Sequence, residues 1–210
     1  VREGNVLLRT TTAEYAYDAA NRRRRKTPLG GGKPTEYLWD ARSRLREVRL
    51  PGGERVLFTY DAFGRRVRKL LVPPPLPPED LGVRAQPKNR FVEYIWSGAV
   101  LAAEIDSERG TRVFVHHPRT MFPLLQIEQG EVFTYVTDAV GTPRELIDER
   151  GQIAWAAAIS PFGRVVDTYR DPGAKEITTP FRQLGHYADD ETGLLYALHR
   201  YFDPETARFL

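Results

Sequence analysis

Residues 15–22 read Tyr15-Ala-Tyr17-Asp18-Ala-Ala-Asn21-Arg22, and this stretch decides the fold because its pattern returns twice. The second copy is Tyr37-Leu-Trp39-Asp40-Ala-Arg-Ser43-Arg44, and the third is Phe58-Thr-Tyr60-Asp61-Ala-Phe-Gly64-Arg65. The copies therefore follow one another every 21 or 22 residues. A unit that recurs at a fixed spacing is typical of a repeat architecture.

Each part of the unit has a mechanical reason. Two aromatic residues separated by one position lie on the same face of a strand, because strand side chains alternate between faces. Asp at the first position of a turn accepts hydrogen bonds from the following amides, and Gly or Asn at the fourth position takes a positive φ at little cost. Such a turn closes a hairpin with a bulge. The Arg then begins the return strand, where it can pair with a carboxylate of this turn or the next, worth about 0 to 1 kcal/mol when exposed.

The same pattern returns in weaker form as Tyr135-Val-Thr-Asp138-Ala-Val-Gly141 and as Pro161-Phe-Gly-Arg164. Between these turns, segments such as Glu131-Val-Phe-Thr-Tyr135 alternate or run apolar, which predicts about a dozen short strands. We therefore expect an all-β fold of antiparallel hairpins with few or no helices.

Composition supports this fold class and excludes several functions. Hydrophobic residues make up 41% of the 210 residues, and 17 Gly and 16 Pro interrupt them. Cysteine is absent, which excludes disulfides and thiolate metal sites. No long uncharged apolar run or signal-peptide pattern is present, so neither a membrane span nor a signal peptide is expected. The net charge of +3 gives little long-range attraction to nucleic acid, and no nucleic-acid partner is expected.

Two local segments depart from the repeat. The basic cluster Arg22–Lys26 could grip phosphates, but in a strand some of these side chains would point to solvent and the others to turn carboxylates, which we favour. The segment Val72–Asp80 holds five prolines in the six positions from 73 to 78. It predicts an inserted surface loop over residues 73–88, with a ligand for a proline-reading domain as the alternative.

The residues offer little support for an ordinary enzyme. His116 and His117 are neighbours and would point to opposite faces of a strand, so one metal ion could hardly use both. His186 and His199 add no acidic or Cys partner at ligand spacing, and Ser97 and Ser160 lack the turn of small residues around a hydrolase nucleophile. We expect no metal, no cofactor and no metabolic activity.

Taken together, the motifs resemble those of Rhs proteins. The tandem units resemble the YD repeats of Rhs proteins, insecticidal toxin complex subunits and teneurins, and the second half resembles the Rhs-associated core. The core-like stretches begin with Tyr135–Leu146, Gly151–Trp155 and Pro161–Arg164. They continue with Phe181–Tyr187, Asp190–Tyr196, Arg200–Pro204 and Arg208-Phe209.

The resemblance implies an architecture and a partner. In this family the repeats wind as a spiral antiparallel sheet into a hollow shell that holds a C-terminal toxin domain until delivery, often by a type VI secretion apparatus. The expected partners are that toxin domain, the remaining shell segments, a secretion spike and an immunity protein. The protein would be bacterial, made in the cytoplasm and then secreted or delivered to a target cell. The corresponding parts are YD repeats (1–72), the loop (73–88), degenerate YD-like strands (89–134) and the core motif (135–210).

The resemblance also implies a processing site. The family's self-cleavage resembles that of an aspartyl protease, in which two carboxylates share a proton. Asp203, with Arg200 nearby to bias its charge, would form half of the pair, and we expect the partner Asp beyond Leu210. Asp203-Pro204 as a plain turn is the alternative. Ala207 stands where the family usually has Gly, and the acidic cluster Asp189–Glu191 is expected to be a solvated turn.

Three functions therefore remain open. The first is a structural shell for a toxin, the second is an autoproteolytic aspartyl-type core that needs residues downstream of Leu210, and the third is a teneurin-like adhesion or carbohydrate-binding repeat protein. The terminal block favours the bacterial shell over adhesion. Strands cut from a longer spiral would leave open edges, so we also expect this segment to depend on its neighbours or on a partner for solubility.

Overall fold

The computed structural model describes residues 6–80, 85 and 87–210. The described residues form eighteen β-strands and two single turns of 3-10 helix, Pro78–Asp80 and Gln183–Gly185, with no α-helix. The expected all-β fold is confirmed, although the estimate of about a dozen strands was too low, because several strands span only two to five residues. None of the described helical turns is long enough to cross a membrane. Of the loop expected over residues 73–88, residues 73–80 are described and contain the 3-10 turn Pro78–Asp80. Residues 81–84 and 86 of this loop lie outside the described residues.

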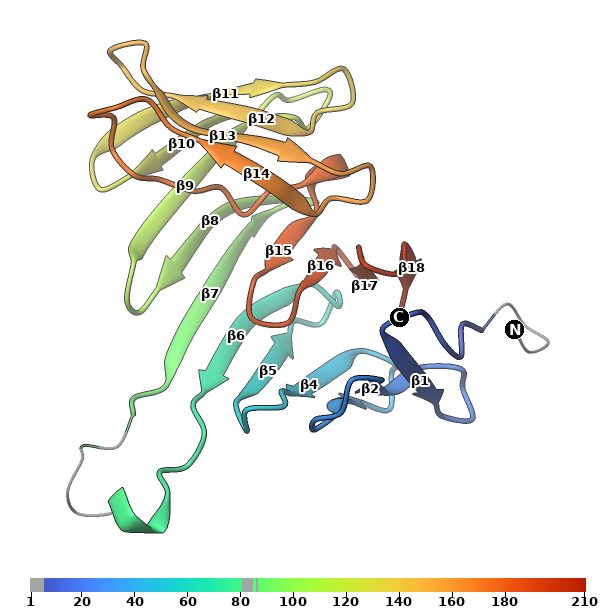
Figure 1. The fold of residues 1–210 in the computed structure, drawn as a ribbon. Coiled ribbons are helices and arrows are strands. Elements are labelled where there is room, and N and C mark those ends of the chain that lie inside the picture. The colour runs from blue at the N-terminus through green and yellow to red at the C-terminus, as the bar shows by residue number, and fades with distance from the viewer. Residues whose placement is uncertain (1–5, 81–84, 86) are drawn as a thin grey trace. The chain divides into compact units, whose positions relative to one another are not determined.

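The chain divides into two compact units, residues 1–91 and 92–209. In the first unit each strand pairs antiparallel with the next along the chain (Figure 1). The strands are β1 (Ala13–Tyr17), β2 (Arg23–Pro28), β3 (Thr35–Trp39), β4 (Leu45–Arg49), β5 (Arg55–Tyr60) and β6 (Arg66–Val72).

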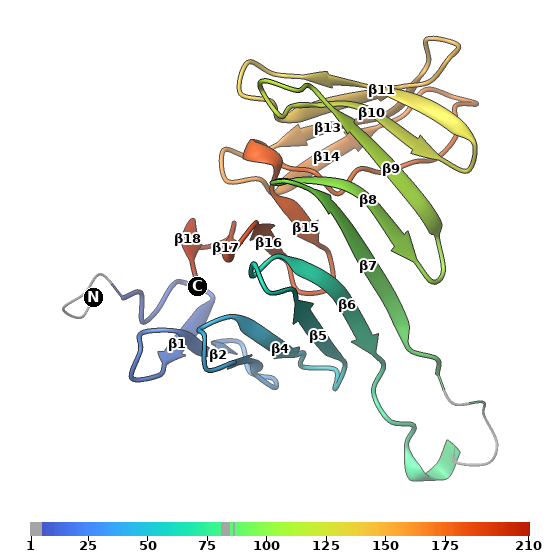
Figure 2. The ribbon, with the colours of Figure 1, turned by 180° about the vertical axis from the view of Figure 1, so that it is seen from behind.

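The second unit holds a sheet of eight such strands and a smaller sheet of four. The larger sheet consists of β7 (Arg90–Ser97), β8 (Val100–Asp106), β9 (Gly110–His116), β10 (Pro123–Glu128), β11 (Glu131–Thr137), β12 (Pro143–Ile147), β13 (Ile153–Ile159) and β14 (Val165–Tyr169). The smaller sheet consists of β15 (Tyr187–Asp189), β16 (Leu194–Ala197), β17 (Arg200–Asp203) and β18 (Arg208–Phe209). Figure 2 shows the strands of the larger sheet succeeding one another from the opposite side.

The repeated turns explain why neighbouring strands pair. At Asp40 the backbone N–H donates to the Arg44 carbonyl (2.9 Å), and the Ser43 N–H donates to the Asp40 carbonyl (3.1 Å). The Asp40 Oδ1 atom accepts the amides of Arg42 (2.8 Å) and Arg44 (2.9 Å), and Ser43 has a φ of 59°. The Arg44 guanidinium returns to the carboxylate of its own turn, with Nε 2.7 Å from Oδ2. Asp18 and Asp61 repeat this arrangement, so the turn chemistry expected from the sequence is confirmed.

Each of these turns is followed by a bulge at the same place. In the first hairpin Ala16 pairs with Arg25 and Tyr17 pairs with Arg23, so the residue between them, Arg24, has no partner in the register. It is the sixth residue after Asp18, the first residue of the turn. A bulge bends its strand and increases the local right-handed twist. The skipped residues in six hairpins are Arg24, Arg46, Val67, Arg144, Ala154 and Val166. The bulge is therefore part of the repeat.

Burial alternates along the strands, but the buried face is not purely apolar. In β2, Arg23 is 1% exposed, and its guanidinium lies over the ring of Tyr15 at 4.6 Å and that of Tyr37 at 5.8 Å. The basic cluster thus splits three ways: Arg22 pairs with Asp18, Arg23 is buried, and Arg24 and Arg25 are exposed. The expected division between solvent and turn carboxylates holds except for Arg23, which stacks on the aromatic pairs that the repeat supplies.

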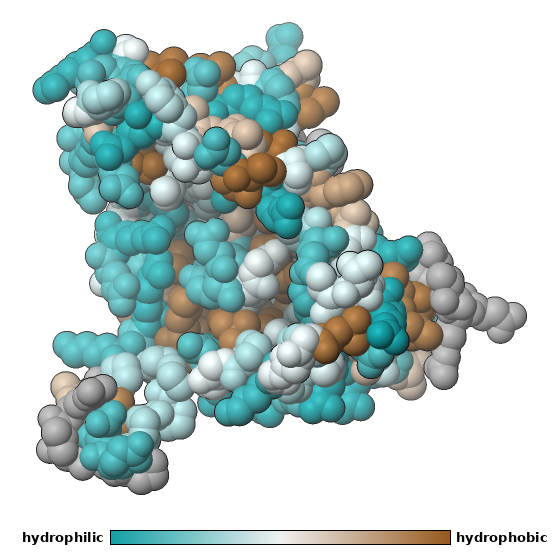
Figure 3. All heavy atoms as spheres, viewed as in Figure 1, coloured by the Kyte–Doolittle hydropathy of each residue, from teal (hydrophilic) through white to brown (hydrophobic). Residues whose placement is uncertain are grey.

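Most of the face seen in Figure 3 is hydrophilic, with hydrophobic residues scattered between. The exposed large apolar side chains include Phe63 at a turn and Val166 and Tyr169 on β14. Isolated exposures of this kind are normal on a protein surface.

Candidate functional site

The second unit contains a buried ion pair between two neighbouring strands. Arg112 of β9 donates from Nε and Nη2 to the Glu104 carboxylate of β8, which lies opposite it in the strand register. Both side chains are almost fully buried. The pair exists because Arg112 occupies the same face of β9 as Phe114, while Val113 and Val115 point to the more exposed face.

A segment of chain without strands passes over this pair. Residues 174–182, called here the crossing segment, connect β14 to β15 and are drawn as the orange-red trace between them in Figure 1. The Thr178 carbonyl accepts hydrogen bonds from Arg112 Nη1 (3.1 Å) and from Gln126 Nε2 (2.9 Å). Tyr135 contributes its hydroxyl, which donates to Gln126 Oε1 (2.7 Å) and lies 2.6 Å from the Thr179 hydroxyl. Side chains of strands β9, β10 and β11 thereby hold the carbonyl of Thr178 and the hydroxyl of Thr179.

Aromatic contacts extend the attachment at the C-terminal end of the crossing segment. Phe181 packs edge-on against Phe114, with ring centroids 4.7 Å apart, and lies 5.5 Å from the His116 ring. The smaller sheet then contacts β7, because Tyr187 packs against Tyr94 at 5.2 Å. Such ring pairs contribute about 0.5–1.5 kcal/mol beyond the area they bury.

The electrostatics of this cluster fix its protonation state. Burial by itself would lower the pKa of Arg112, but the Glu104 carboxylate raises it above its usual value. Burial raises the pKa of the Tyr135 and Tyr187 phenols, so both stay neutral at physiological pH. The cluster therefore holds one charged pair and a set of neutral hydrogen-bonding groups. This chemistry suits structural attachment of the crossing segment.

The predicted processing residues lie in the smaller sheet, on opposite faces of β17. Asp203 is buried, and its Oδ1 accepts the Glu205 amide at 2.9 Å, as in a turn. Arg200 is exposed, and its guanidinium lies 3.9 Å from the ring centroid of Phe209. Because these two residues are three positions apart in one strand, alternation separates their side chains. The structure does not bring Arg200 to the Asp203 carboxylate.

A second buried carboxylate lies in the same small sheet. Asp189 ends β15 and pairs with Leu194 of β16, and β16 pairs in turn with β17, the strand that ends at Asp203. Asp189 is 1% exposed, so the expectation that it belongs to a solvated turn was wrong for this residue, whereas Asp190 is exposed. Ala207 has a φ of 54°, a backbone conformation that favours Gly, the residue that the resemblance implies at this position.

The histidines do not form a metal site. Among the described residues no group of three or more His, Cys, Asp or Glu side chains is placed to hold a metal ion. Burial lowers the pKa of His116 and of His186, and nearby Arg200 adds to the effect on His186.

The attachment cluster was not found from the sequence. Glu104, Arg112 and Gln126 belong to no motif, and their partner Thr178 is 52 or more residues away. One signal was available: Arg112 is in phase with Phe114, so a charged residue falls on the apolar face of an alternating strand.

Known protein families match two parts of this chain. The family described as RHS Repeat matches residues 39–70, and the family described as RHS protein matches residues 132–169. The first match covers the turns at Asp40 and Asp61, and the second covers nearly all of β11 and all of β12–β14.

Several relatives are toxin proteins. Double-stranded DNA deaminase toxin A of Burkholderia cenocepacia (strain H111) is 30% identical over 233 aligned residues, which include 99% of this chain and 16% of that protein. Toxin protein Tse5 of Pseudomonas aeruginosa is 29% identical over 98% of this chain and 17% of that protein. The chain thus spans about a sixth of the length of these relatives.

A solved structure has the same fold. The crystal structure of TcdB2-TccC3 superposes with a TM-score of 0.61 at 15% identity, covering 94% of this chain and 12% of that chain. The repeat pattern, the turns and both family matches agree, and the chain belongs to the Rhs/YD-repeat proteins.

Proposed function

We propose that this chain is a wall segment of a shell that encloses a toxin domain located C-terminally in the same protein. The observation that carries the proposal is the bulge at the sixth residue after the first residue of six turns. Bulges placed in register add the same bend at every hairpin, which is how a sheet acquires sustained curvature. A sheet that keeps curving in one sense can surround a volume.

The crossing segment suits the same role. A curved sheet with one open face exposes its buried-side residues unless something covers them, and the crossing segment covers Arg112, Gln126 and Tyr135. The hydrogen bonds to the Thr178 carbonyl hold the backbone of that segment, and the Thr179 hydroxyl and the Phe181 ring add side-chain contacts. We infer that it supports the wall from within the second unit.

The toxin as cargo is supported by the relatives, several of which are named as toxins. Delivery out of the producing bacterium, through a type VI apparatus or another route, follows from the family resemblance and is proposed with it. An immunity protein in the producing cell is part of the same proposal.

Protease protection tests enclosure. In the full-length protein that contains these residues, a C-terminal epitope tag should survive limited proteolysis under native conditions. Arg112→Met should loosen the wall and make the tag sensitive, whereas the exposed control Arg150→Gln should leave it protected. A tag that is cleaved equally fast in wild type and in Arg112→Met would contradict enclosure.

Self-cleavage is the second candidate, favoured by the burial of both Asp203 and Asp189 in the smaller sheet. We propose that Asp203 supplies one carboxylate of an aspartyl pair, with Arg200 in a supporting role only if its side chain leaves Phe209. Full-length Asp203→Asn should then remain uncleaved while folding normally. Cleavage of that variant at the wild-type rate would leave Asp203 with the turn role alone.

A further inference from the structure

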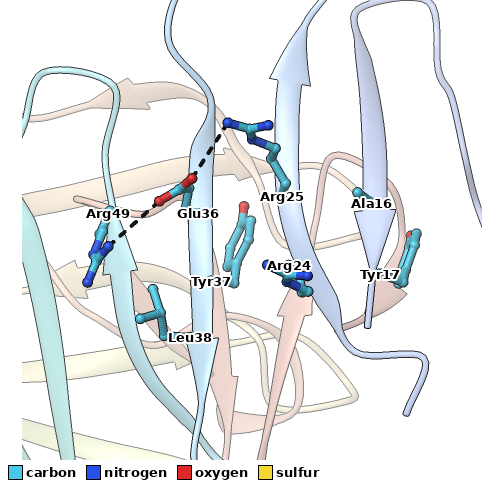
Figure 4. Close-up of a pocket in the computed structure, with 8 residues that line it drawn as sticks. All are labelled: Ala16, Tyr17, Arg24, Arg25, Glu36, Tyr37, Leu38 and Arg49. Carbon is cyan, nitrogen blue, oxygen red and sulfur yellow. Dashed lines mark ion pairs between the residues drawn. The ribbon is translucent and has the colours of Figure 1, made fainter. Parts of the chain in front are cut away.

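A groove on the first unit shares no lining residue with the attachment cluster or with the predicted processing residues. It has a volume of about 390 Å³ and opens on strands β1–β4 (Figure 4). Its lining includes Arg24, Arg25, Glu36, Leu38 and Arg49. Neither the shell wall nor the self-cleavage role uses these side chains.

Strand register explains why these side chains meet. Ala16 pairs with Arg25, Arg25 pairs with Glu36, and Glu36 pairs with Arg49, so a single cross-strand row runs over four strands on one face. Arg24 is the bulge residue of the first hairpin and lines the same groove. The bulge that bends the sheet therefore adds a further cation to the row.

The groove has more positive than negative charge. Figure 4 shows Glu36 between Arg25 and Arg49, and the separations are 3.6 Å and 3.9 Å, longer than in a hydrogen-bonded ion pair. Arg49 also donates to Glu47 (2.9 Å), a buried carboxylate that it shares with Arg55. Within the described part of the chain, the exposed Arg24 side chain has no ion pair or hydrogen bond. In the groove itself, three guanidinium groups therefore face one carboxylate, that of Glu36.

The surrounding unit strengthens this field. Residues 1–91 contain 20 Lys and Arg against 10 Asp and Glu, a formal charge of +10, whereas residues 92–210 contain 11 against 18, a formal charge of −7. The small net charge of the whole chain conceals this division. A strongly basic face raises the association rate of acidic partners at low salt.

We propose that this groove docks an acidic polypeptide segment in extended conformation. Carboxylates two positions apart in such a segment point to the same side at about 6.6 Å spacing, so they can reach the guanidinium groups on either side of Glu36. The apolar Leu38 side chain offers a contact for the residues between them. A single-stranded nucleic acid fits less well, because Glu36 would repel a continuous phosphate chain. Of the two rings in the lining, Tyr37 is only 5% exposed, which leaves the half-buried Tyr17 as a single ring for base stacking.

Fluorescence anisotropy on the full-length protein tests this assignment. The probes are a short labelled peptide of alternating glutamate and threonine and a labelled oligothymidylate of equal charge. The triple variant Arg24→Gln/Arg25→Gln/Arg49→Gln should weaken peptide binding at least about tenfold, since exposed ion pairs contribute up to roughly 1 kcal/mol each. The matched control Arg109→Gln/Arg119→Gln/Arg150→Gln removes the same charge from exposed positions in the second unit and should bind like wild type.

A second pair of variants sharpens the test. Glu36→Gln removes the internal competitor and should tighten peptide binding, whereas Glu149→Gln, with the same change in net charge, should not. Equal losses in the two triple variants, or tighter binding of the oligothymidylate than of the peptide, would overturn the proposal. Circular dichroism confirms that the variants fold, and the protease-protection assay remains independent because no groove residue supports the crossing segment.

Discussion

The two units use the same turn but place their ion pairs differently. In the first unit Asp18, Asp40 and Asp61 each pair with the Arg four residues later, in a half-exposed position at the turn itself. In the second unit that Arg is replaced by Thr142 after Asp138 and by Gln152 after Asp148. Asp138 instead pairs with Arg144, six residues later (2.9 Å), and a buried ion pair joins Glu104 and Arg112 beneath the crossing segment.

The turn geometry survives this change. The Asp138 and Asp148 carboxylates still accept two amides each, and even Ser160 accepts the Arg164 amide through its hydroxyl (3.1 Å). All three turns keep the same backbone hydrogen bonds and the bulge. The hairpin therefore requires a side-chain acceptor and a residue that tolerates positive φ, and the ion pair is an addition. The buried Arg112 of the second unit also joins segments that are distant in sequence, because it donates to the Thr178 carbonyl.

The largest expected effect is on the buried pair. Arg112→Met leaves Glu104 buried without its partner and should destabilise the second unit by about 3–5 kcal/mol, because an uncompensated buried charge is costly. The double variant Arg112→Met/Glu104→Leu should recover part of the loss. Hydrogen exchange of the β9–β11 amides in the intact protein measures both. Equal protection in Arg112→Met and wild type would mean that the pair does not hold the segment.

Two turn glycines with the same φ should differ because of what surrounds them. Gly141 (φ 81°) has Phe122 Cδ1 only 2.3 Å from the position of an added Cβ, whereas Gly151 (φ 79°) has open space there. Gly151→Ala should cost roughly 1 kcal/mol from backbone strain alone. Gly141→Ala adds overpacking and should cost about 2–4 kcal/mol. Thermal unfolding of the two variants measures the difference in stability between them. Equal decreases in unfolding temperature would contradict a contribution from packing against Phe122.

The turn acceptor should matter more than the ion pair in the first unit. Asp40→Ala loses two amide hydrogen bonds and the Arg44 pair and should cost about 1–2 kcal/mol. Asp40→Asn keeps an acceptor oxygen and should cost no more than about 1 kcal/mol, the worth of an exposed ion pair. Local hydrogen exchange in β3 and β4 separates the two variants. If Asp40→Asn lost as much stability as Asp40→Ala, the charge of the carboxylate would matter more than its role as a hydrogen-bond acceptor.

Mild acid should affect the second unit first. The pKa values of His116 and His186 are lowered in the fold, so the unfolded chain binds protons first and stability falls as the pH drops below 6.5. In the first unit, burial by itself would raise the pKa values of Asp18 and Asp40. The hydrogen bonds from their Arg partners and from backbone amides outweigh this effect, so both pKa values lie below 3.8. Their contribution is lost only as the pH falls through those lowered values.

Hydrogen exchange at about pH 5 and at neutral pH should therefore show increased opening of β9 and β15 with little change in β1–β4. His116→Gln/His186→Gln should reduce the difference. If both units opened equally at about pH 5, or if the double variant opened as much as wild type, these histidines would be excluded as the source of the pH dependence.

The sequence alone determined the hairpins. Asp, a residue that tolerates positive φ and the flanking aromatic pairs act within about eight residues, and local chemistry of this kind is visible in the order of residues. The fold class, the turns at Asp18, Asp40 and Asp61, their bulges and the family resemblance all follow from it.

Only the tertiary structure decided what the faces of those hairpins contact. The burial of Arg23, the pairing of Arg112 with Glu104 under Thr178, and the separation of Arg200 from Asp203 depend on strand register and on chain segments up to 66 residues apart. Alternation in a strand says that side chains lie on one face, but it does not say which face is covered or by what. That depends on the path of the chain between the sheets, for which the repeat has no local signal.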